Sequence, residues 1–424
     1  MARILEIYDI EVLANCFTYT SYVPDEDKYY QFVIWKKRNE YNEFCEHITR
    51  GIYQVGFNNE DYDYPVLHHL LNHYEAYKYL PSNELVMHIY DKSQELIDME
   101  FSAIADKNKF IPQLDLYRIW HFNNPARACS LKHLEVAMKM DNVEDMPFDH
   151  THYVQNEEEL QLILDYNKHD VKATYEFFKI TKGETDHPLY AKKDKLLLRK
   201  QIMSAHQIPC LNYPDVKLGE QLLLKLYCEY TKKNVFDVKK LKSPRSEIKL
   251  ADCIFDYIKF ETPAFKALHE WLLKQTITST KGAFTKIPLS RVELLLDHVD
   301  KSLIGKDGKT GEKFLLNLNI MTPFGPIIYG TGGLHHSQSG VYRADDKWMI
   351  LDIDVGSLYP SIGVQNNLYP EHLGPIFSNI YDSNIVSVRL AEKSKPKKER
   401  DPVIMEGFKL AANGAYGKDV IFFP

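Results

Sequence analysis

Residues 4–13 read Ile-Leu-Glu-Ile-Tyr-Asp-Ile-Glu-Val-Leu, an apolar run that carries β-branched and aromatic residues. This composition predicts a β-strand. Side chains two residues apart leave the same face of a strand, so Asp9 and Glu11 are expected to point the same way. Two carboxylates this close repel each other unless a cation neutralises them. The stretch therefore indicates a metal site or, alternatively, an edge strand with a solvated polar stripe.

The same strand signal recurs in the following residues, and two helical patterns come after it. Strands are expected at 4–12, 16–23, 29–35 and 52–57. A helix is expected from Asp63 to about Leu80, with Pro65 in its first turn, where a missing N–H costs nothing. A second helix is expected from Asn156 to Lys182, because it starts with acids and ends with a base, as the helix dipole favours. A sheet followed by helices predicts an α/β domain up to about residue 185.

Length and composition restrict the class of protein. The chain has 424 residues, which predicts two to three domains. Its net charge of −7 excludes a histone-like coat for nucleic acid, so contacts with phosphate must come from local basic patches. No stretch approaches the roughly 18 apolar residues of a membrane span, which predicts no membrane partner. Acids within the first apolar run exclude a secretory signal and favour the cytoplasm. The six cysteines form no C-x-x-C pair and are expected to be reduced and buried.

Two further segments place acids next to tyrosines. Residues 56–63 read Gly-Phe-Asn-Asn-Glu-Asp-Tyr-Asp, where a strand is expected to end in a polar loop. Asp63 would then begin a helix, and capping that helix is the alternative role for its side chain. Tyr166 and Asp170 lie four residues apart in the second expected helix, so their side chains share one face. Each segment alone is a weak signal, because such short patterns also arise by chance.

Taken together and in this order, these residues resemble the ExoI, ExoII and ExoIII motifs of the 3′→5′ exonuclease domain of family B DNA polymerases. Residues 130–134, Ser-Leu-Lys-His-Leu, are similar to the (S/T)-L-x-x-h motif of that domain, which binds a single-stranded 3′ end. The resemblance implies a ribonuclease H-like α/β fold, with a mixed sheet and flanking helices. It also implies two Mg²⁺ or Mn²⁺ ions per active site, which suit hard oxygen ligands. The implied metal ligands are Asp9, Glu11, Asp63 and Asp170.

The same resemblance implies roles for residues around these acids. Tyr166 would orient the attacking water, a role that needs a fixed hydroxyl group. Asn58, Ser130 and Leu131 would contact DNA. Asp61 competes with Asp63 for the second motif, and we prefer Asp63 because it directly follows Tyr62.

A second constellation begins at residue 348. Residues 348–362 read Trp-Met-Ile-Leu-Asp-Ile-Asp-Val-Gly-Ser-Leu-Tyr-Pro-Ser-Ile. An apolar strand over 347–355, a turn, and a helix that opens near Pro360 are expected from this pattern. A strand-turn-helix joint with a capping serine is the structural alternative.

Residues 354–361 resemble motif A of family B DNA polymerases, D-x-x-S-L-Y-P-S. By this resemblance Asp354 binds both catalytic metals, and Ser357 and Leu358 belong to the nucleotide site. The Tyr359 ring would lie under the incoming sugar, where it collides with a 2′-hydroxyl group. The resemblance therefore implies selection of deoxynucleotides.

Residues 409–417 read Lys-Leu-Ala-Ala-Asn-Gly-Ala-Tyr-Gly and resemble motif B, K-x-x-x-N-S-x-Y-G, with Gly414 in place of serine. The spacing places Lys409, Asn413 and Tyr416 on one stripe of a helix, and an amphipathic helix ended by a glycine cap is the alternative. The resemblance implies that Lys409 and Asn413 bind the nucleotide, with Lys409 on its triphosphate. The implied DNA contacts are Tyr416 and Gly417, together with Tyr329, Gly332 and Gly333 of a segment similar to the family's Y-x-G-G loop.

These motifs predict three domains. The expected boundaries are 1–185 for the exonuclease, 186–312 for a mostly helical connecting region, and 313–424 for a partial α+β palm and fingers. The family's second palm acid, in motif C, lies downstream of motif B, whereas only seven residues follow Gly417. We therefore expect the N-terminal portion of a phage-type family B DNA-directed DNA polymerase, completed by a second chain that carries motif C and the thumb.

The expected partners follow from that function in DNA replication. They are primer-template DNA, single-stranded 3′ ends and, once the polymerase site is completed, dNTPs, in the host cytoplasm for a phage protein. Two alternatives stay open, namely a stand-alone 3′→5′ exonuclease and a catalytically silent DNA-binding fragment. The silent fragment would bind DNA with a strong salt dependence but without metal-dependent turnover.

Overall fold

The computed structural model describes residues 3–99, 102–187, 190–330 and 333–417, without the side chains of residues 416 and 417. The chain forms two compact units. One contains the residues up to Leu241 together with those from Ser357 onward, and the other is Lys242–Gly356. The expected domain boundaries near residues 185 and 312 stay a prediction.

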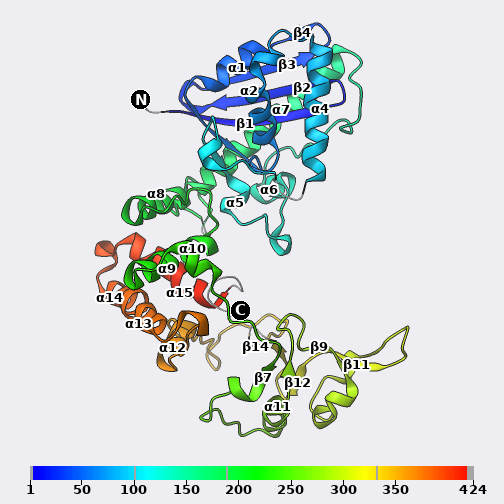
Figure 1. Ribbon diagram of the computed structural model, residues 1–424. Coiled ribbons are helices and arrows are strands. Elements are labelled where there is room, and N and C mark those ends of the chain that lie inside the picture. Colours follow the sequence, from blue (N-terminus) through cyan, green and yellow to red (C-terminus); the bar gives the residue numbers. More distant parts are fainter. Residues whose placement is uncertain (1–2, 100–101, 188–189, 331–332, 418–424) are drawn as a thin grey trace. The chain divides into compact units, whose positions relative to one another are not determined.

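One mixed sheet of six strands dominates the start of the chain (Figure 1). Its strand order is β4-β3-β2-β1-β5-β6. The strands are β1 (Ile4–Leu13), β2 (Cys16–Val23), β3 (Lys28–Trp35), β4 (Arg38–Asn39), β5 (Ile52–Gly56) and β6 (Gln113–Asp115). β1 pairs antiparallel with β2 but parallel with β5, which in turn pairs parallel with β6. The four strands expected from the sequence are confirmed.

Helices cover both faces of this sheet, which makes the region an α/β fold. They are α1 (Tyr41–Thr49), α2 (Asp63–Asn72), α3 (Tyr74–Tyr77), α4 (Ser82–Asp98), α5 (Leu116–Ile119), α6 (Leu131–Met138) and α7 (Glu157–Thr181). Along β1, Tyr8 and Ile10 join the core beneath α1, α2 and α4, whereas Ile7 packs in the core that contains α7. Asp9 and Glu11 have the parity of Ile7, so the pleat directs both acids toward the face that α7 covers.

Of the two helices expected in this region, the first is interrupted and the second is continuous. The first is interrupted, because α2 ends at Asn72 and His73 leaves helical geometry before the single turn of α3. The second is confirmed as α7, whose N-cap Asn156 accepts a hydrogen bond from the Glu159 N–H at 2.9 Å. A side-chain acceptor at this position satisfies one of the free N–H groups of the first turn.

A second helical region of the same unit surrounds its own core. Its helices are α8 (Lys195–His206), α9 (Asp215–Thr231), α10 (Val235–Lys240), α12 (Leu358–Gln365), α13 (Ile376–Tyr381), α14 (Ser387–Ser394) and α15 (Phe408–Gly417). Leu222 and Tyr227 of α9 are buried there with Phe377, Tyr381 and Ala411. The helix expected over the motif B-like segment is confirmed as α15. Gly414, the departure from that motif, faces α9, since a Cβ there would lie 3.7 Å from the Glu220 nitrogen.

The closest approach of α9 and α15 depends on a glycine. A Cβ at position 219 would lie 2.2 Å from the backbone oxygen of Leu410. Gly219→Ala is therefore expected to lower the free energy of unfolding by about 2 kcal/mol, because the overpacking penalty exceeds the gain in helix propensity. Urea denaturation followed by circular dichroism measures this change.

Gly407 offers a matched control on the same bundle. A Cβ there meets only the flexible ends of Ile202 and Leu222, at 3.3 and 3.4 Å. Gly407→Ala is thus expected to change stability by less than about 1 kcal/mol. Equal effects of the two substitutions would contradict the close backbone contact at Gly219.

The unit Lys242–Gly356 consists mainly of short strands. They are β7 (Ile248–Lys249), β8 (Thr276–Ile277), β9 (Thr285–Pro288), β10 (Ile304–Lys306), β11 (Lys313–Asn317), β12 (Asn319–Thr322), β13 (Gly325–Gly330) and β14 (Gly333–His335), with α11 at Pro263–Leu273. Two three-stranded sheets, β10-β11-β9 and β12-β13-β14, enclose a core with Trp271, Leu315 and Ile320. Strands after residue 313 were expected. The expectation of a mostly helical region holds for α8 to α10 but is wrong for 242–312, where short strands and one-turn helices surround α11.

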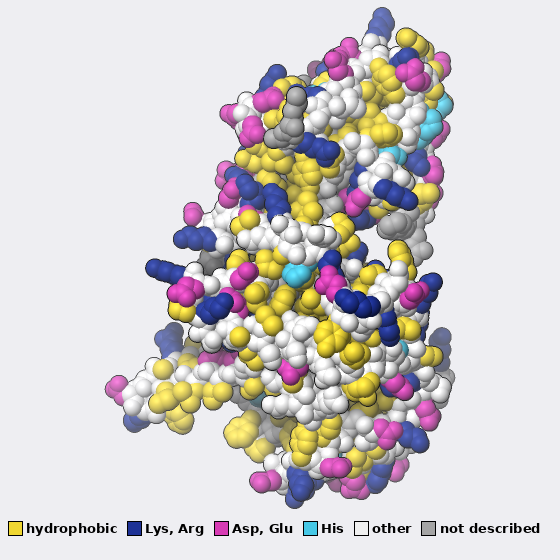
Figure 2. Space-filling model, turned by 60° about the vertical axis from the view of Figure 1, so that its left-hand side comes forward, with side chains coloured by type: hydrophobic (Ala, Val, Ile, Leu, Met, Phe, Trp, Pro, Cys, Tyr) yellow, Lys and Arg dark blue, Asp and Glu magenta, His cyan; other side chains and the backbone are white. Residues whose placement is uncertain are grey.

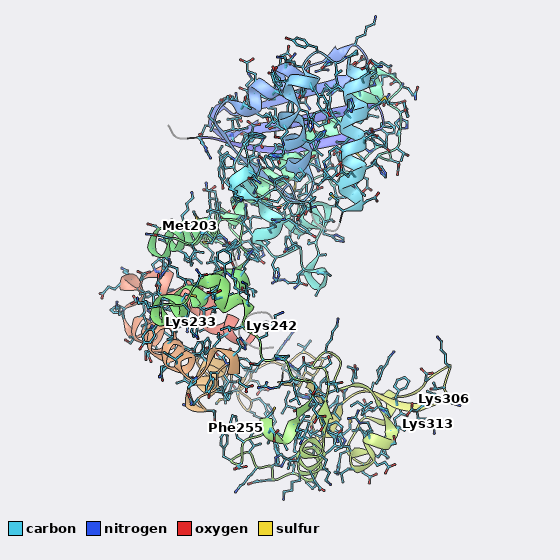
Figure 3. The ribbon with its side chains drawn as sticks, in the orientation of Figure 1. Met203, Lys233, Lys242, Phe255, Lys306 and Lys313 are labelled. Carbon is cyan, nitrogen blue, oxygen red and sulfur yellow. The ribbon has the colours of Figure 1, made fainter. Side chains whose placement is uncertain are left out.

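The hairpin of β10 and β11 carries two lysines in directly opposed positions. Lys306 pairs with Lys313 across the two strands (Figure 3). Like charges in such positions are unfavourable unless solvent screens them. On the face of the molecule drawn in Figure 2, Lys and Arg side chains are interspersed with Asp and Glu, and no continuous basic patch covers that face.

The strand expected over 347–355 is absent. This segment contains only turns, bends and irregular backbone, and Trp348, Leu351 and Ile353 are 73%, 70% and 83% exposed. A strand forms only when a neighbouring strand pairs with its N–H and C=O groups, and no described strand pairs with this one. The apolar pattern therefore predicted the wrong local structure. The helix expected after it is present as α12.

Two further expectations concern the whole chain. All six cysteines are free, and the burial expected for them holds for Cys16, Cys45, Cys210 and Cys228 but is wrong for Cys129, which is half-buried, and for Cys253, which is exposed. None of the described helices has both the length and the apolar composition needed to cross a bilayer.

Candidate metal centre

Three of the predicted carboxylates converge at one place. Asp9 and Glu11 lie on β1, and Asp170 lies on α7, which packs across β1 and β2. Each acid offers one oxygen atom, and the three oxygens lie within 4.8 Å of one another. Among the described residues, no other group of three or more acids, histidines and cysteines is this compact. These three side chains can therefore share one cation.

The surroundings of these acids favour a bound cation. Burial is the main cause that raises the pKa of Asp9 well above its usual value, and the charges of Asp63 and Glu11 add to it. Burial, followed by the charge of Asp170, likewise raises the pKa of Glu11. The Oδ1 atom of Asp170 is buried and has no hydrogen-bond partner among the described residues. A divalent cation with hard oxygen ligands would relieve the repulsion and satisfy this atom, so the donor set fits Mg²⁺ or Mn²⁺.

The structure distinguishes Asp63 from Asp61. Asp63 is the first residue of α2 and is buried, and its charge is the largest carboxylate contribution to the raised pKa of Asp9. Burial raises the pKa of Asp63 itself to about 7. Asp61 instead forms an ion pair with Arg118, whose Nη2 lies 2.5 Å from Asp61 Oδ1. Asp63 thus interacts electrostatically with Asp9 and Glu11 but is not one of the three acids whose oxygens lie within 4.8 Å, whereas Asp61 has another partner.

Tyr166 lies beside this group, one turn before Asp170 on α7. Its side chain is buried, and burial followed by the charges of Asp170 and Glu11 raises the pKa of the phenol. The hydroxyl group therefore stays protonated at neutral pH. The ammonium group of Lys132, on α6, lies 5.6 Å from the centre of the Tyr166 ring and forms an ion pair with Asp145 at 2.7 Å. Its positive charge lowers the pKa values of Glu11 and Asp170, partly opposing the effect of burial.

Asn167 holds Asp9 in place, and sequence reasoning missed it. Its Nδ2 donates a hydrogen bond to Asp9 Oδ2 at 2.6 Å, and its Oδ1 accepts one from the Thr18 hydroxyl at 3.4 Å. The side chain is fully buried. An asparagine between Tyr166 and Asp170 is the available signal, but only the packing of α7 on the sheet shows that it faces inward.

Asp115 supports the loop that leads to Asp63, and it was also missed. Its Oδ1 accepts the N–H of Asn58 at 3.1 Å, and its Oδ2 accepts the N–H of Glu60 at 3.2 Å. Its Oδ1 also caps α5 by accepting the N–H of Tyr117 at 2.9 Å. Asn58 has a positive φ of 64°, which the hydrogen bond from its N–H helps to hold. The loop is thus fixed from β6, the neighbouring strand.

The predicted DNA contacts of the first constellation lie near α6. Ser130 is its N-cap, and the Ser130 hydroxyl accepts the N–H of His133 at 3.3 Å while it also contacts His133 Nδ1 at 2.7 Å. Leu131 is the first residue of the helix and is half-buried. The capping geometry explains the serine without DNA, so the contacts of Asn58, Ser130 and Leu131 with DNA stay a prediction.

The second constellation does not form a carboxylate cluster in this structure. Asp354 is exposed in the irregular segment and belongs to no described group of three potential metal ligands. Ser357 precedes α12, and its hydroxyl accepts a hydrogen bond from Arg389 Nη1 at 3.2 Å. Leu358 and Tyr359 are exposed at the start of that helix. Lys409 lies 3.8 Å from Glu406, and Asn413 is exposed on the same helix, α15.

The remaining predicted contacts lie at the ends of described segments. Tyr329 belongs to β13, where its ring packs edge-on against Phe284 with the ring centres 5.0 Å apart. Gly333 opens β14, with a φ of 133° that only glycine adopts readily. Gly332 lies outside the described residues, and Tyr416 and Gly417 are described only by their backbone. The roles of these residues in binding DNA stay a prediction.

The raised carboxyl pKa values predict a pH-dependent response to metal. A folded chain whose carboxyl pKa values are raised binds more protons than the unfolded chain, so its stability falls as pH rises from about 4 to about 7. Mn²⁺ would reverse that loss by binding the ionised groups of the folded chain. We expect Mn²⁺ to raise the melting temperature by several degrees at pH 8 and by about a degree or less at pH 5. Differential scanning fluorimetry with and without EDTA tests this, and equal shifts at the two pH values would contradict it.

Comparison with known proteins adds no assignment. No model of a known protein family matches the chain, and the search of curated proteins gives no significant match. The function is therefore inferred from the residues of the site and from the motifs that place them.

Proposed function

We propose that the first part of this chain is a metal-dependent 3′→5′ exonuclease of ribonuclease H-like fold, and that it proofreads for a DNA polymerase of family B. The observation that carries the proposal is the convergence of Asp9, Glu11 and Asp170 within 4.8 Å. The D-x-E pair and the Y-x-x-x-D pair come from distant parts of the sequence, and the exonuclease resemblance requires them to meet at one place.

The residues can divide the work of phosphodiester hydrolysis among them. Asp9, Glu11 and Asp170, with Asp63 beside them, would hold divalent cations. When bound, such ions activate water and neutralise the charge on the leaving 3′-oxygen. Tyr166 would orient the attacking water through its protonated hydroxyl group, because the raised pKa keeps the phenol neutral. Asn167 would keep Asp9 in the orientation that metal binding needs, since its amide donates to one Asp9 oxygen and leaves the other available.

The polymerase part of the proposal depends on the motif A-like and motif B-like segments. Asp354 would bind the catalytic metals, Ser357, Leu358 and Tyr359 would surround the nucleotide, and Lys409 with Asn413 would bind its triphosphate. Primer-template DNA and dNTPs would be the substrates. A stand-alone exonuclease is the alternative, and only an assay with dNTPs separates the two.

The test uses the purified chain with Mg²⁺ and DNA labelled at a defined end. A single strand with a 5′ label should give a ladder that shortens from its 3′ end, and a strand with a 3′ label should release a labelled mononucleotide. Internal cleavage, or absence of turnover in both Mg²⁺ and Mn²⁺, would contradict the exonuclease. Extension of a primer when dNTPs are present supports the polymerase, whereas shortening alone under those conditions supports the stand-alone exonuclease.

A further inference from the structure

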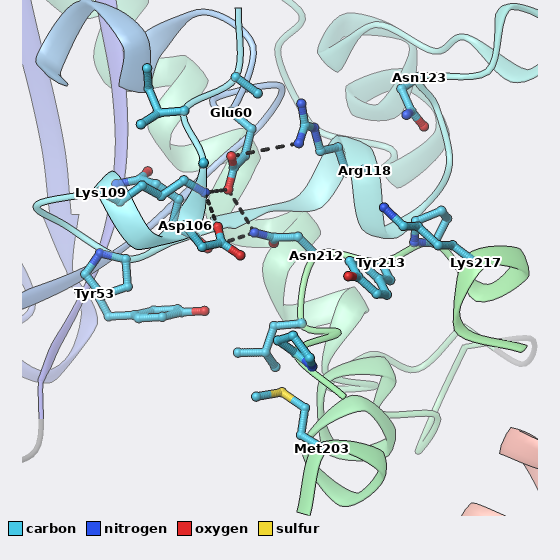
Figure 4. Close-up of a pocket in the computed structure, with 18 of the residues that line it drawn as sticks. Tyr53, Glu60, Asp106, Lys109, Arg118, Asn123, Met203, Asn212, Tyr213 and Lys217 are labelled. Carbon is cyan, nitrogen blue, oxygen red and sulfur yellow. Dashed lines mark hydrogen bonds and ion pairs between the residues drawn. The ribbon is translucent and has the colours of Figure 1, made fainter. Parts of the chain in front are cut away.

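A cavity of about 960 Å³ lies at the β6 edge of the sheet, away from the three acids. Its lining comes from two parts of the first unit, the sheet with the loops around it and the segment that links α8 to α9 (Figure 4). Cavities that bind small molecules and cofactors typically measure roughly 300–1,000 Å³. The space is therefore sufficient for a ligand of cofactor size.

One wall of the cavity is a closed polar network. Lys109 forms ion pairs with Glu60 and with Asp106, the latter at 2.7 Å. Asn212 donates to Glu60 Oε1 at 2.9 Å and also pairs with the backbone of the edge strand β6, at Gln113 O and Asp115 N. Figure 4 shows the side chains of Glu60, Lys109, Asp106 and Asn212 meeting at this wall of the cavity. Together with Arg118, which lies 3.8 Å from Glu60, these charges are mutually balanced, so this wall is a fixed frame rather than a binding group.

One cation of the lining is not balanced in this way. Lys217, on α9, has no carboxylate within ion-pair distance among the described residues, and its ammonium group lies 4.2 Å from the centre of the Tyr213 ring. Arg118 lines the same cavity, but it forms ion pairs with Asp61 at 2.5 Å and with Glu60 and Asp115 at 3.8 Å each. Desolvation lowers the pKa of Lys217; the negative charge of Glu220, also in the lining, opposes this effect, and the positive charge of Arg118 adds to it. An anion beside Lys217 would compensate the charge of its ammonium group.

The cavity also offers aromatic and hydrogen-bonding groups. Tyr53 of β5 and Tyr213 lie on opposite walls in Figure 4, with their hydroxyl groups directed into the space between them. No described residue forms a hydrogen bond with either hydroxyl group. Met203 of α8 adds a polarisable apolar surface below them. An anionic group joined to a planar, hydrogen-bonding ring is the chemistry that fits all of these features.

We propose that this cavity binds a nucleoside monophosphate, with its phosphate on Lys217 and its base against Tyr53 and Met203. Glu60, in the cavity wall, precedes Asp63 by three residues in the loop that Asp115 anchors. A ligand here therefore contacts the loop that leads to the candidate metal centre. The source of the nucleotide rests on the proposed function, since a 3′→5′ exonuclease releases nucleoside monophosphates, but the binding site itself does not.

Isothermal titration calorimetry of the whole chain with deoxyadenosine 5′-monophosphate tests the proposal. EDTA is present throughout, and the Asp9→Asn variant is titrated in parallel, so that binding through metal at the three acids is excluded. We expect Lys217→Met to weaken binding at least tenfold, because a charge-assisted contact is lost. Lys217→Arg should retain most of the affinity. Lys233→Met is the matched control, because Lys233 also lies over a tyrosine ring, at 6.0 Å from Tyr227, but outside the cavity (Figure 3).

Separate titrations with deoxyadenosine and with inorganic phosphate measure the affinity for each of the two parts of the nucleotide. Weak binding of each part and tighter binding of the whole support a nucleotide site. Phosphate that binds as tightly as the nucleotide, or affinity that Lys217→Met leaves unchanged, would overturn the proposal. These titrations need neither metal nor turnover. They can therefore disprove the nucleotide site without disproving the exonuclease, and the exonuclease assay can fail without affecting the nucleotide site.

Discussion

Asp9→Asn is expected to slow the metal-dependent shortening of single-stranded DNA by about a thousandfold. Asparagine keeps the shape of the side chain and an oxygen that can accept the Asn167 amide, which lies 2.6 Å from Asp9 in the native chain. It removes the charge that shares a cation with Glu11 and Asp170. Metal ions supply several kcal/mol of charge stabilisation in such reactions, which corresponds to about three orders of magnitude in rate. Single-turnover release of a 3′-labelled nucleotide in Mg²⁺ measures this change.

Asp61→Asn is the matched control. It makes the same chemical change two residues before Asp63, but Asp61 pairs with Arg118 rather than with the three acids. Its rate is expected to stay within about fivefold of the native value, because partly exposed ion pairs contribute little. Binding of the same DNA in EDTA should be equal for both variants, which separates lost chemistry from lost folding. Similar losses of rate for the two variants would show that Asp9 has no special part in the reaction.

The candidate centre was largely predictable because each half of it is a local pattern. The period of a strand places Asp9 and Glu11 on one face, and the period of a helix places Tyr166 and Asp170 on one face. Nothing in the residues themselves brings the two halves together. The resemblance to the exonuclease motifs supplied that link, and the packing of α7 on β1 provides it in the structure.

The supporting residues were not predictable, for a physical reason. Asn167 and Asp115 are polar, and in a sequence such residues read as solvated positions or caps. Their buried hydrogen bonds depend on which neighbour the tertiary fold presents, Asp9 in one case and the Asn58 loop in the other. The absent strand at 347–355 shows the same limit. Its apolar pattern is typical of a strand, but no described strand pairs with it.

The largest loss of stability is expected from Arg199→Met, in the junction between the sheet and the helical region. Arg199 lies on α8 and is fully buried. Its guanidinium donates to the backbone oxygens of Tyr213 at 2.7 Å and Ile119 at 3.4 Å, and it forms an ion pair with Asp215 at 2.8 Å. One side chain thus joins α8, the start of α9 and the end of α5. Removing it leaves the buried carbonyl groups without their donor and one oxygen of Asp215 without its partner, which costs about 3–5 kcal/mol.

Lys195→Met tests whether the buried guanidinium, rather than the charge of Asp215, is responsible. Lys195 contacts the other oxygen of Asp215 at 2.7 Å but remains partly exposed, so its loss is expected to cost less than about 1 kcal/mol. Urea denaturation followed by circular dichroism compares the two variants with the native chain. Ile119 ends the short helix that Asp115 caps, so Arg199→Met is also expected to loosen the loop before Asp63 and slow the exonuclease reaction. If Arg199→Met costs no more than Lys195→Met, the guanidinium does not hold the junction, and the three elements must be joined by apolar packing alone.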